Sequence, residues 1–401
     1  MILDRLIAIF TSLRLTVVCL AFGMVLVLAG TLAQGDLGLY KVQHEFFRSL
    51  FVLWRPLGAG LPIPLPGGYL VGGVLLINLV CAHYRRFTFT RDKAGIWLIH
   101  FGLILLLLGQ LLTDLLSRDS LLHLRQGEAK NYSESNREVE LAVIDVTDPA
   151  VDKVVAIPQG QLMRRQGIRE AALPFSIRVK DYYANAAVAR RPADSVEPPA
   201  ATQGIGQEAI VKGLPRVTAT DQRDEPSAIV ELVSPQGSLG SWLVSEQFGA
   251  AQAVSCGNRV FNLALRLRRF YQPFSLQLLE FRHDVYPGTE IPKNFSSRVL
   301  LRRPETGERR EVLIYMNNPL RYAGQTFYQA DFDPDDQGTV LEVVHNPSWL
   351  TPYLSCVLVG AGLVWQFATH LLGFTLFGKR APASGPAAAP APALALKHTK
   401  A

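Results

Sequence analysis

Residues Ala94 to Thr113 read AGIWLIHFGLILLLLGQLLT, an uncharged run with Lys93 before it and Asp114 after it. In a helix, about 20 apolar residues match one crossing of a lipid bilayer. The run holds a single titratable side chain, His100, about 10 Å along the helix from Lys93 at the usual rise per residue. Such a residue is costly in hydrocarbon and usually faces a bundle interior or a cavity. The run therefore predicts a membrane helix, with either a ligand or proton site at His100 or a helix-to-helix hydrogen bond there.

The composition of the whole chain supports a membrane protein. Of its 401 residues 49% are hydrophobic, and these are gathered into long runs, which argues against a large soluble enzyme. The formal net charge is +6, but the Lys and Arg residues mainly flank apolar runs and form no dense basic block. We interpret them as topology signals and expect no nucleic acid as a partner. The four cysteines form neither a Cys-x-x-Cys pair nor a Cys-x-x-Cys-His haem attachment site, which disfavours a thiol oxidoreductase or a c-type cytochrome.

Three further apolar runs complete a predicted set of four transmembrane helices. The first three helices are expected at about residues 15–34, 67–84 and 94–113, within a membrane unit of residues 1–113, and the fourth at 347–378. Between the first two, residues 42–54 have apolar side chains at helical spacing, which predicts a short helix on the membrane surface or packed on the soluble domain.

The basic residues set the expected orientation. Arg85, Arg86, Arg91 and Lys93 share the short loop between the second and third helices, and the positive-inside bias places this loop in the cytoplasm together with both termini. Residues 114–346 are then extracytoplasmic. The low-complexity residues 379–401 are expected to form a disordered cytoplasmic tail.

The large exported region has the pattern of strands. Short alternating or β-branched runs such as VELAVIDV (139–146) and FNLALRLRRF (261–270) are separated by Pro, Gly and Asn. They predict a β-rich domain with a sandwich-like or barrel-like antiparallel sheet, so the fold class is a membrane α+β protein. About residues 189–227, rich in prolines and scattered charges, are expected to be a mobile insertion.

These features disfavour a transporter, which would normally show paired and broken apolar segments, and a sensor, which needs a cytoplasmic output domain. Several irregular motifs are more informative. They are YPGTEIPKNFSSRV (Tyr286 to Val299), MNNPLRYAGQTFYQADF (Met316 to Phe332), SLRLTV before the first span, GTLAQ (Gly30 to Gln34) and LINL (Leu76 to Leu79).

With these motifs in this order, the chain resembles the ResB family of cytochrome c biogenesis proteins, the membrane subunit of the system II machinery. The resemblance implies that haem is a transient cofactor, shared with a second membrane subunit that carries a Trp-rich haem-binding segment, and that apocytochrome c is a further partner. This chain has five Trp and no Trp-rich tract. We therefore expect a haem-handling subunit without catalytic residues of its own. A non-haem structural scaffold that stabilises a membrane partner is the alternative.

The resemblance also bears on individual residues. It implies an intramembrane histidine in the third span, paired with a histidine of the partner, and His100 is the one candidate there; Trp97 lies one turn away on roughly the same face. Polar residues of the second long motif are expected to form a surface for the partner or the haem edge, or else to be scaffold. They are Asn317, Asn318, Arg321, Tyr322, Gln325 and Tyr328. The roles of three further histidines stay open. His44 is either solvated or close to a haem edge, and His83 and His370 are either anchoring or packing residues or neighbours of His100 at a similar depth.

Overall fold

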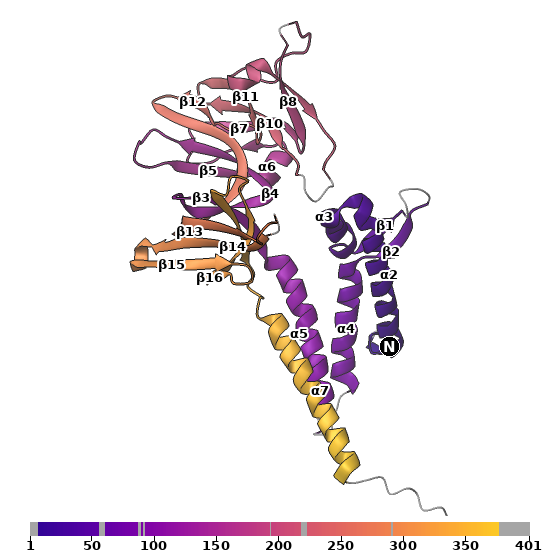
Figure 1. Cartoon of the computed structure of the whole chain (residues 1–401). Coiled ribbons are helices and arrows are strands. Elements are labelled where there is room, and N and C mark those ends of the chain that lie inside the picture. The colour runs from indigo at the N-terminus through magenta and orange to yellow at the C-terminus, as the bar shows by residue number, and fades with distance from the viewer. Residues whose placement is uncertain are drawn as a thin grey trace, which may run out of the picture. The chain divides into compact units, whose positions relative to one another are not determined.

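A computed structural model describes residues 7–55, 61–86, 90, 93–192, 194–217, 223–289 and 292–376. In this part of the chain, four helices are long and apolar enough to cross a membrane (Figure 1). They are α2 (Leu13–Leu37), α4 (Gly68–Arg86), α5 (Ala94–Leu116) and α7 (Thr351–Leu376). The prediction of four apolar helices and a β-rich domain is confirmed. Arg91 and the predicted tail at 379–401 lie outside the described residues.

The chain forms two compact units. The first comprises Met1–Leu15, Leu76–Gly109 and Leu350–Ala401, and the second comprises Thr16–Leu75 and Gln110–Trp349.

In the first unit, α5 packs closely on α7 through small residues. Gly95 and Gly102 of α5 are buried, and a Cβ at Gly95 would lie 2.7 Å from the carbonyl oxygen of Gly362. A Cβ at Gly102 would lie 2.8 Å from Cγ2 of Val359. Small residues at helix contacts allow this close approach of backbones in apolar surroundings. A larger side chain at either glycine would push the two helices apart.

One buried amide ties α4 to the N-terminal segment of the same unit. The Nδ2 of Asn78 donates to the carbonyl oxygens of Phe10 and Ser12, at 2.6 and 3.1 Å. Asn78 is 2% exposed, so these bonds satisfy a polar group that would otherwise be costly to bury.

In the second unit, a small cap connects α2 to α4. It contains α3 (Leu39–Val42), the π-helical turn η1 (Gln43–Phe47), β1 (Phe51–Trp54) and β2 (Ile63–Pro66), and β1 and β2 pair antiparallel. The prediction of one helix over residues 42–54 is therefore wrong for its second half. The helical spacing of apolar residues continues into β1, but pairing with β2 makes the chain extended there.

The β domain of the second unit has two lobes. The sandwich lobe packs a four-stranded sheet, in the order β11-β10-β7-β6, against part of a ten-stranded sheet. The strands of the small sheet are β6 (Gly167–Ile168), β7 (Ser176–Tyr183), β10 (Ser227–Ser234) and β11 (Gly237–Ser245). The facing strands are β4 (Ala129–Asp145), β5 (Lys153–Pro158), β12 (Gln252–Cys256) and β13 (Arg259–Val285). Their common core includes Leu141, Ile177, Val230, Phe261 and Leu263.

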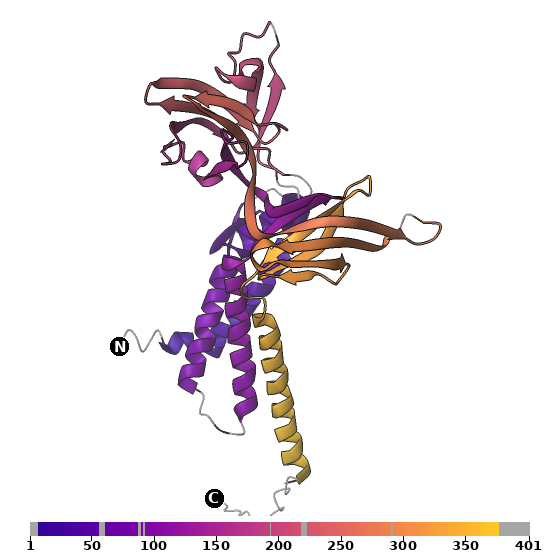
Figure 2. The same ribbon diagram turned by 90° about the vertical axis from the view of Figure 1, so that its left-hand side faces the viewer.

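The barrel lobe is a nearly closed sheet in the order β15-β14-β13-β4-β3-β18-β17-β16. Its further strands are β3 (Arg118–Arg125), β14 (Pro292–Arg303), β15 (Glu308–Tyr315), β16 (Leu320–Tyr322), β17 (Gln325–Phe332) and β18 (Gly338–His345). The 27-residue strand β13 runs through both lobes, pairing with β4 and then with β14 (Figure 2). The lobes therefore share one continuous backbone ladder.

The segment predicted to be a mobile insertion, about residues 189–227, contains regular structure in its described part. β8 (Ala186–Arg190) pairs with β9 (Ala209–Gly213), and the 3-10 turn η4 (Gly204–Glu208) precedes β9. The mobility of this segment stays a prediction.

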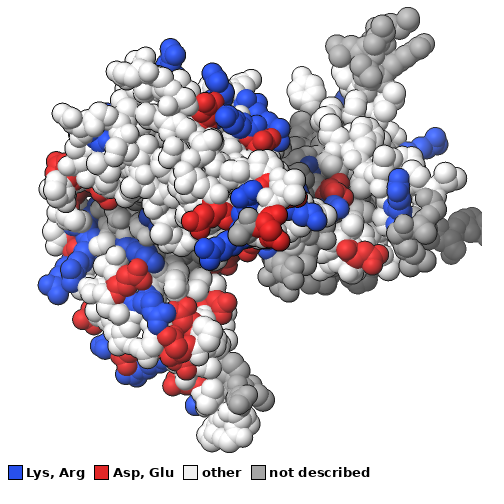
Figure 3. Space-filling model, turned by 90° about the horizontal axis from the view of Figure 1, so that it is seen from above, with Lys and Arg blue, Asp and Glu red and all other residues white. Residues whose placement is uncertain are grey.

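Two short helical elements complete the described structure of the β domain, α6 (Gln159–Met163) and η5 (Pro304–Thr306). On the face seen in Figure 3, Lys and Arg side chains are interspersed with Asp and Glu. Cross-strand ion pairs occur in this domain, as between Arg269 of β13 and Glu134 of β4 at 2.9 Å.

Candidate functional site

His100 lies on α5 with one ring nitrogen bonded to the helix backbone. Its Nδ1 is 2.8 Å from the carbonyl oxygen of Ile96, one turn earlier. A carbonyl oxygen only accepts hydrogen bonds, so Nδ1 carries the proton and donates it. In the neutral ring, the lone pair is then on Nε2. A histidine whose other ring nitrogen is held by a backbone carbonyl has the arrangement usual for a metal ligand.

Two further rings of the same unit lie around His100. The ring centroids of His83, on α4, and His100 are 5.8 Å apart with an angle of 44° between the planes. Trp97 lies edge-to-face on His83, with centroids 3.9 Å apart and an angle of 83°. Helices α4 and α5 thus bring His83, Trp97 and His100 together; we call these three residues the ring cluster.

Haem needs fewer protein ligands than a bare zinc ion does. Among the described residues, no group of three or more His, Cys, Asp or Glu side chains is placed to hold a metal, whereas zinc takes three or four protein ligands. For haem, the porphyrin supplies the equatorial ligands and the protein adds only the axial ones. Apolar side chains on the outer faces of the same helices, such as Ile77 and Phe101, are exposed and offer surface that a porphyrin face prefers.

The remaining histidines named from the sequence have other surroundings. His370 lies on α7, where the side-chain amide of Gln366 donates to its Nε2 over 2.7 Å. His44 is an exposed residue of η1 in the second unit. His83 and His370 were both expected at about the depth of His100, and the structure brings the His83 ring to 5.8 Å from that of His100. From the sequence, His83 was not chosen as a site residue. The available signal was its position two residues before Arg85, at the end of the second apolar run that is nearest the loop to the third.

The six polar residues of the 316–332 motif lie on two hairpins of the barrel lobe. Asn317 occupies the β15–β16 turn with a positive φ of 62°, and the Tyr315 and Asn318 backbones bond to each other across this turn. Ala323 and Gly324 form the β16–β17 turn with φ of 49° and 76°. Positive φ at both central residues is the geometry of a tight hairpin turn. The motif thus encodes two turns.

The structure divides these six residues between two faces. Tyr322 and Gln325 are cross-strand partners on the face that also carries the buried Leu320 and Phe327. The hydroxyl of Tyr322 donates to Glu308 Oε2 at 2.6 Å, and its ring packs edge-on against Phe274. The side chains that remain exposed are Asn317, Asn318, Arg321 and Tyr328. The six residues therefore do not form one continuous outer surface.

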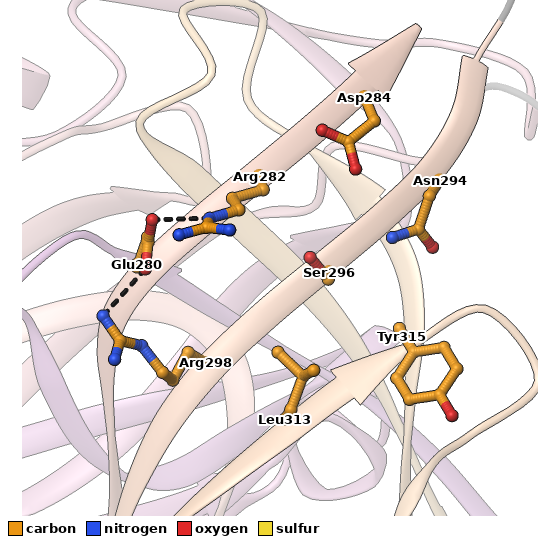
Figure 4. A pocket seen from close by; sticks show the side chains of 8 residues that line it. All are labelled: Glu280, Arg282, Asp284, Asn294, Ser296, Arg298, Leu313 and Tyr315. Carbon is orange, nitrogen blue, oxygen red and sulfur yellow. Dashed lines mark hydrogen bonds and ion pairs between the residues drawn. The ribbon is translucent and has the colours of Figure 1, made fainter.

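The outer face of β13, β14 and β15 carries a polar hollow of about 550 Å³ (Figure 4). Its lining residues are Glu280, Arg282, Asp284, Asn294, Ser296, Arg298, Leu313 and Tyr315. Glu280 accepts hydrogen bonds from Arg282 and Arg298 at 2.6 and 2.8 Å. Both bonds lower the pKa of its carboxyl group, and the bond from Arg282 has the larger effect. Three lining residues belong to the 286–299 motif. Sequence reasoning missed this hollow because its residues come from three strands.

A second feature missed from the sequence is a polar tie at the end of α5. Asp114, 11% exposed, forms an ion pair with Arg48 of the cap at 2.5 Å and accepts a hydrogen bond from the hydroxyl of Tyr69 on α4. The available signal was an aspartate placed directly after an apolar run. The tie joins α4, α5 and the cap.

Comparison with known proteins bears on the β domain most strongly. A model of the ResB-like family matches residues 234–346, from the last residue of β10 to just beyond β18. The protein NrfI of Wolinella succinogenes is 26% identical over 298 residues, which cover 73% of this chain and 29% of that protein. The chain thus spans less than a third of the length of this curated relative. The resemblance to the ResB family predicted from the sequence is confirmed.

Proposed function

Because the chain is related to the ResB family, we propose that it is a ResB-like subunit of a system II cytochrome c biogenesis complex. In this function it holds or conveys haem that is to be attached covalently to apocytochrome c. The observation that carries the proposal is the placement of His100, whose Nδ1 donates to the carbonyl oxygen of Ile96 and whose ring lies 5.8 Å from that of His83. Of its two ring nitrogens, Nε2 is then the one suited to bind a metal.

In this proposal each residue of the ring cluster has a separate part. His100 would help to hold the haem iron through Nε2, together with a histidine of the partner subunit. The rings of Trp97 and His83 would line the site beside His100. When bound, haem supplies the iron and the porphyrin that is passed on; this chain contributes a ligand and apolar surface, and no catalytic residue.

The placement in the cell follows the basic residues. We propose that the four helices cross the bacterial cytoplasmic membrane, with the 85–93 loop and both termini inside and residues 114–346 outside. The partners would be a second membrane subunit with a Trp-rich haem-binding segment and apocytochrome c. Export-dependent reporter fusions test this orientation: activity is expected near Gly204 and absent in the 85–93 loop, and the opposite pattern would overturn it.

The haem proposal is tested by purifying the chain with its partner subunit and recording absorption spectra. His100→Ala should insert at normal abundance. Its co-purified haem per protein should fall about tenfold or more, because a ligand to the iron is gone, and added imidazole should restore part of this haem. His370→Ala is the matched control, since it removes an intramembrane histidine that is outside the ring cluster, and it should keep wild-type haem content.

The alternative of a non-haem scaffold makes a different forecast. A scaffold shows no Soret band in any preparation, and His100→Ala then changes only the stability of the complex. If His100→Ala keeps the wild-type haem content, His100 is not a haem ligand.

A further inference from the structure

The hairpin of β1 and β2 has an outer face made only of apolar residues. Phe51 and Leu53 of β1 are each 70% exposed, and their cross-strand partners are Pro66 and Pro64. Side chains alternate across a strand, so these four share one face. Two large apolar side chains left this exposed in a row are unusual for a surface in water.

The inner face of the same hairpin packs on the side of α2. Val52 and Leu65 are buried in one cluster with Leu26, Ala29 and Ala33 of α2. These α2 residues belong to its uncharged run, which continues to Gln34, and Leu26 lies about 12 Å below Gln34 at the helical rise per residue. The hairpin therefore shares a buried core with the apolar part of α2.

Backbone hydrogen bonds also fix the position of the hairpin along the axis of α4. The backbone N–H of Gly67 donates to the carbonyl oxygen of Leu50 at 2.8 Å, and that of Tyr69 donates to Ser49 at 3.2 Å. The hairpin ladder thus continues into the first turn of α4, where a Cβ at Gly68 would lie 2.8 Å from the Cα of Phe47. A rigid join of this kind sets the depth of the hairpin by the depth of α4.

The prolines of β2 reduce the number of unpaired N–H groups at its outer edge, which suits surroundings without water. A strand at an edge normally presents unpaired N–H groups, and each costs several kcal/mol in hydrocarbon. Pro64 and Pro66 have no N–H, while Leu65 between them is free to donate to β1. Alternate residues of a strand point their backbone groups to opposite edges. The edge of β2 that faces away from β1 therefore lacks donors at both proline positions.

From these observations we propose that the β1–β2 hairpin is a membrane anchor whose outer face lies in lipid, at the boundary between headgroups and acyl chains. The occupant of this face is lipid, because the face carries no charged side chain and the hairpin is joined by backbone hydrogen bonds to the first turn of the apolar helix α4. The inference requires that α2 and α4 cross the membrane, and it does not depend on haem binding.

Site-directed spin labelling in nanodiscs of phosphatidylcholine and phosphatidylglycerol tests the anchor. In the full chain with its four cysteines replaced, a label at Leu53→Cys should be more accessible to oxygen, which concentrates in lipid, than to a water-soluble nickel chelate. Glu311→Cys, at an exposed position of β15, is the matched control and should show the opposite order. Label mobility at Leu53→Cys should stay high, because the side chain is exposed.

Two outcomes contradict the anchor. Access to the nickel chelate equal to that at Glu311→Cys means that the hairpin is in water. A label immobilised and shielded from both reagents means that protein covers the face. Phe51→Cys repeats the measurement at a second outward position, so that a local disturbance at residue 53 cannot decide the result.

Discussion

The ring cluster of the helices and the 316–332 motif of the barrel lobe were both singled out from the sequence, but the structure treats them differently. His100 has a second histidine ring 5.8 Å away and a tautomer set by its own helix. Tyr322 and Gln325 face the core side of the barrel sheet, and the other four motif residues lie at turns or on the outer face. A lone titratable residue in an apolar helix thus marked a place where two histidine rings meet, whereas an irregular polar motif marked turns.

The strongest way to test this difference is to remove a core residue of the motif. Phe327 is 2% exposed, and Phe327→Ala should lower the free energy of unfolding by about 3–5 kcal/mol because it leaves a cavity. Tyr328→Ala, one residue later on the outer face, should change it by no more than about 0.5 kcal/mol. Guanidinium unfolding of the full chain in detergent, followed by circular dichroism, measures both. Equal losses of unfolding free energy in the two variants would contradict the assignment of Phe327 to the core face and Tyr328 to the outer face.

A smaller effect is expected at the polar tie of the cap. Asp114→Asn removes the charge that Arg48 and Tyr69 share, and should cost about 1–3 kcal/mol, the range for hydrogen bonds to charged groups. Glu138→Gln, in an exposed pair with Arg268, is the control and should cost less than about 1 kcal/mol. The same unfolding measurement compares them. A loss at Asp114→Asn no larger than the control would mean that the tie does not hold the cap to the helices.

The smallest effect concerns the pH dependence of the sandwich lobe. The pKa of Asp145 is lowered from 3.8 to about 2 by hydrogen bonds from the Thr147 hydroxyl and the Arg259 guanidinium. A carboxyl group with a lowered pKa in the folded state stabilises the fold above its unfolded pKa, and this stability is lost as the pH falls from about 3.8 to about 2. The melting temperature of Asp145→Asn should therefore depend less on pH than that of the wild type in this interval. Identical slopes would contradict the lowered pKa.

The sequence was sufficient for features that depend on local pattern. Uncharged runs the length of a bilayer predicted α2, α4, α5 and α7, and period-two alternation predicted strands such as the one around Leu141 and Val143. The order of strands in the sheet was not readable, because β4 pairs with β13 across more than a hundred residues. Register at that distance is set by tertiary packing, and local propensity does not specify it.

The candidate site was readable only in part for a similar reason. The sequence placed His100 and His83 at comparable depth, but the rotation of α4 and α5 that turns the two rings together depends on packing of whole helices. The hairpin of the cap shows the opposite case. Phe51 and Trp54 are three residues apart, which fits a helical period, and only the pairing with the proline-rich strand β2 makes the chain extended there.

The most direct test of the central claim is to exchange the proposed iron ligand. With the partner subunit present, His100→Met replaces the imidazole by a thioether, and axial ligand identity sets the haem spectrum and raises the potential when methionine replaces histidine. The account predicts either a displaced Soret band with a higher midpoint potential or loss of the haem, while Leu108→Met, about two turns further along α5, leaves both unchanged. A His100→Met complex with the wild-type haem content, spectrum and potential would contradict it.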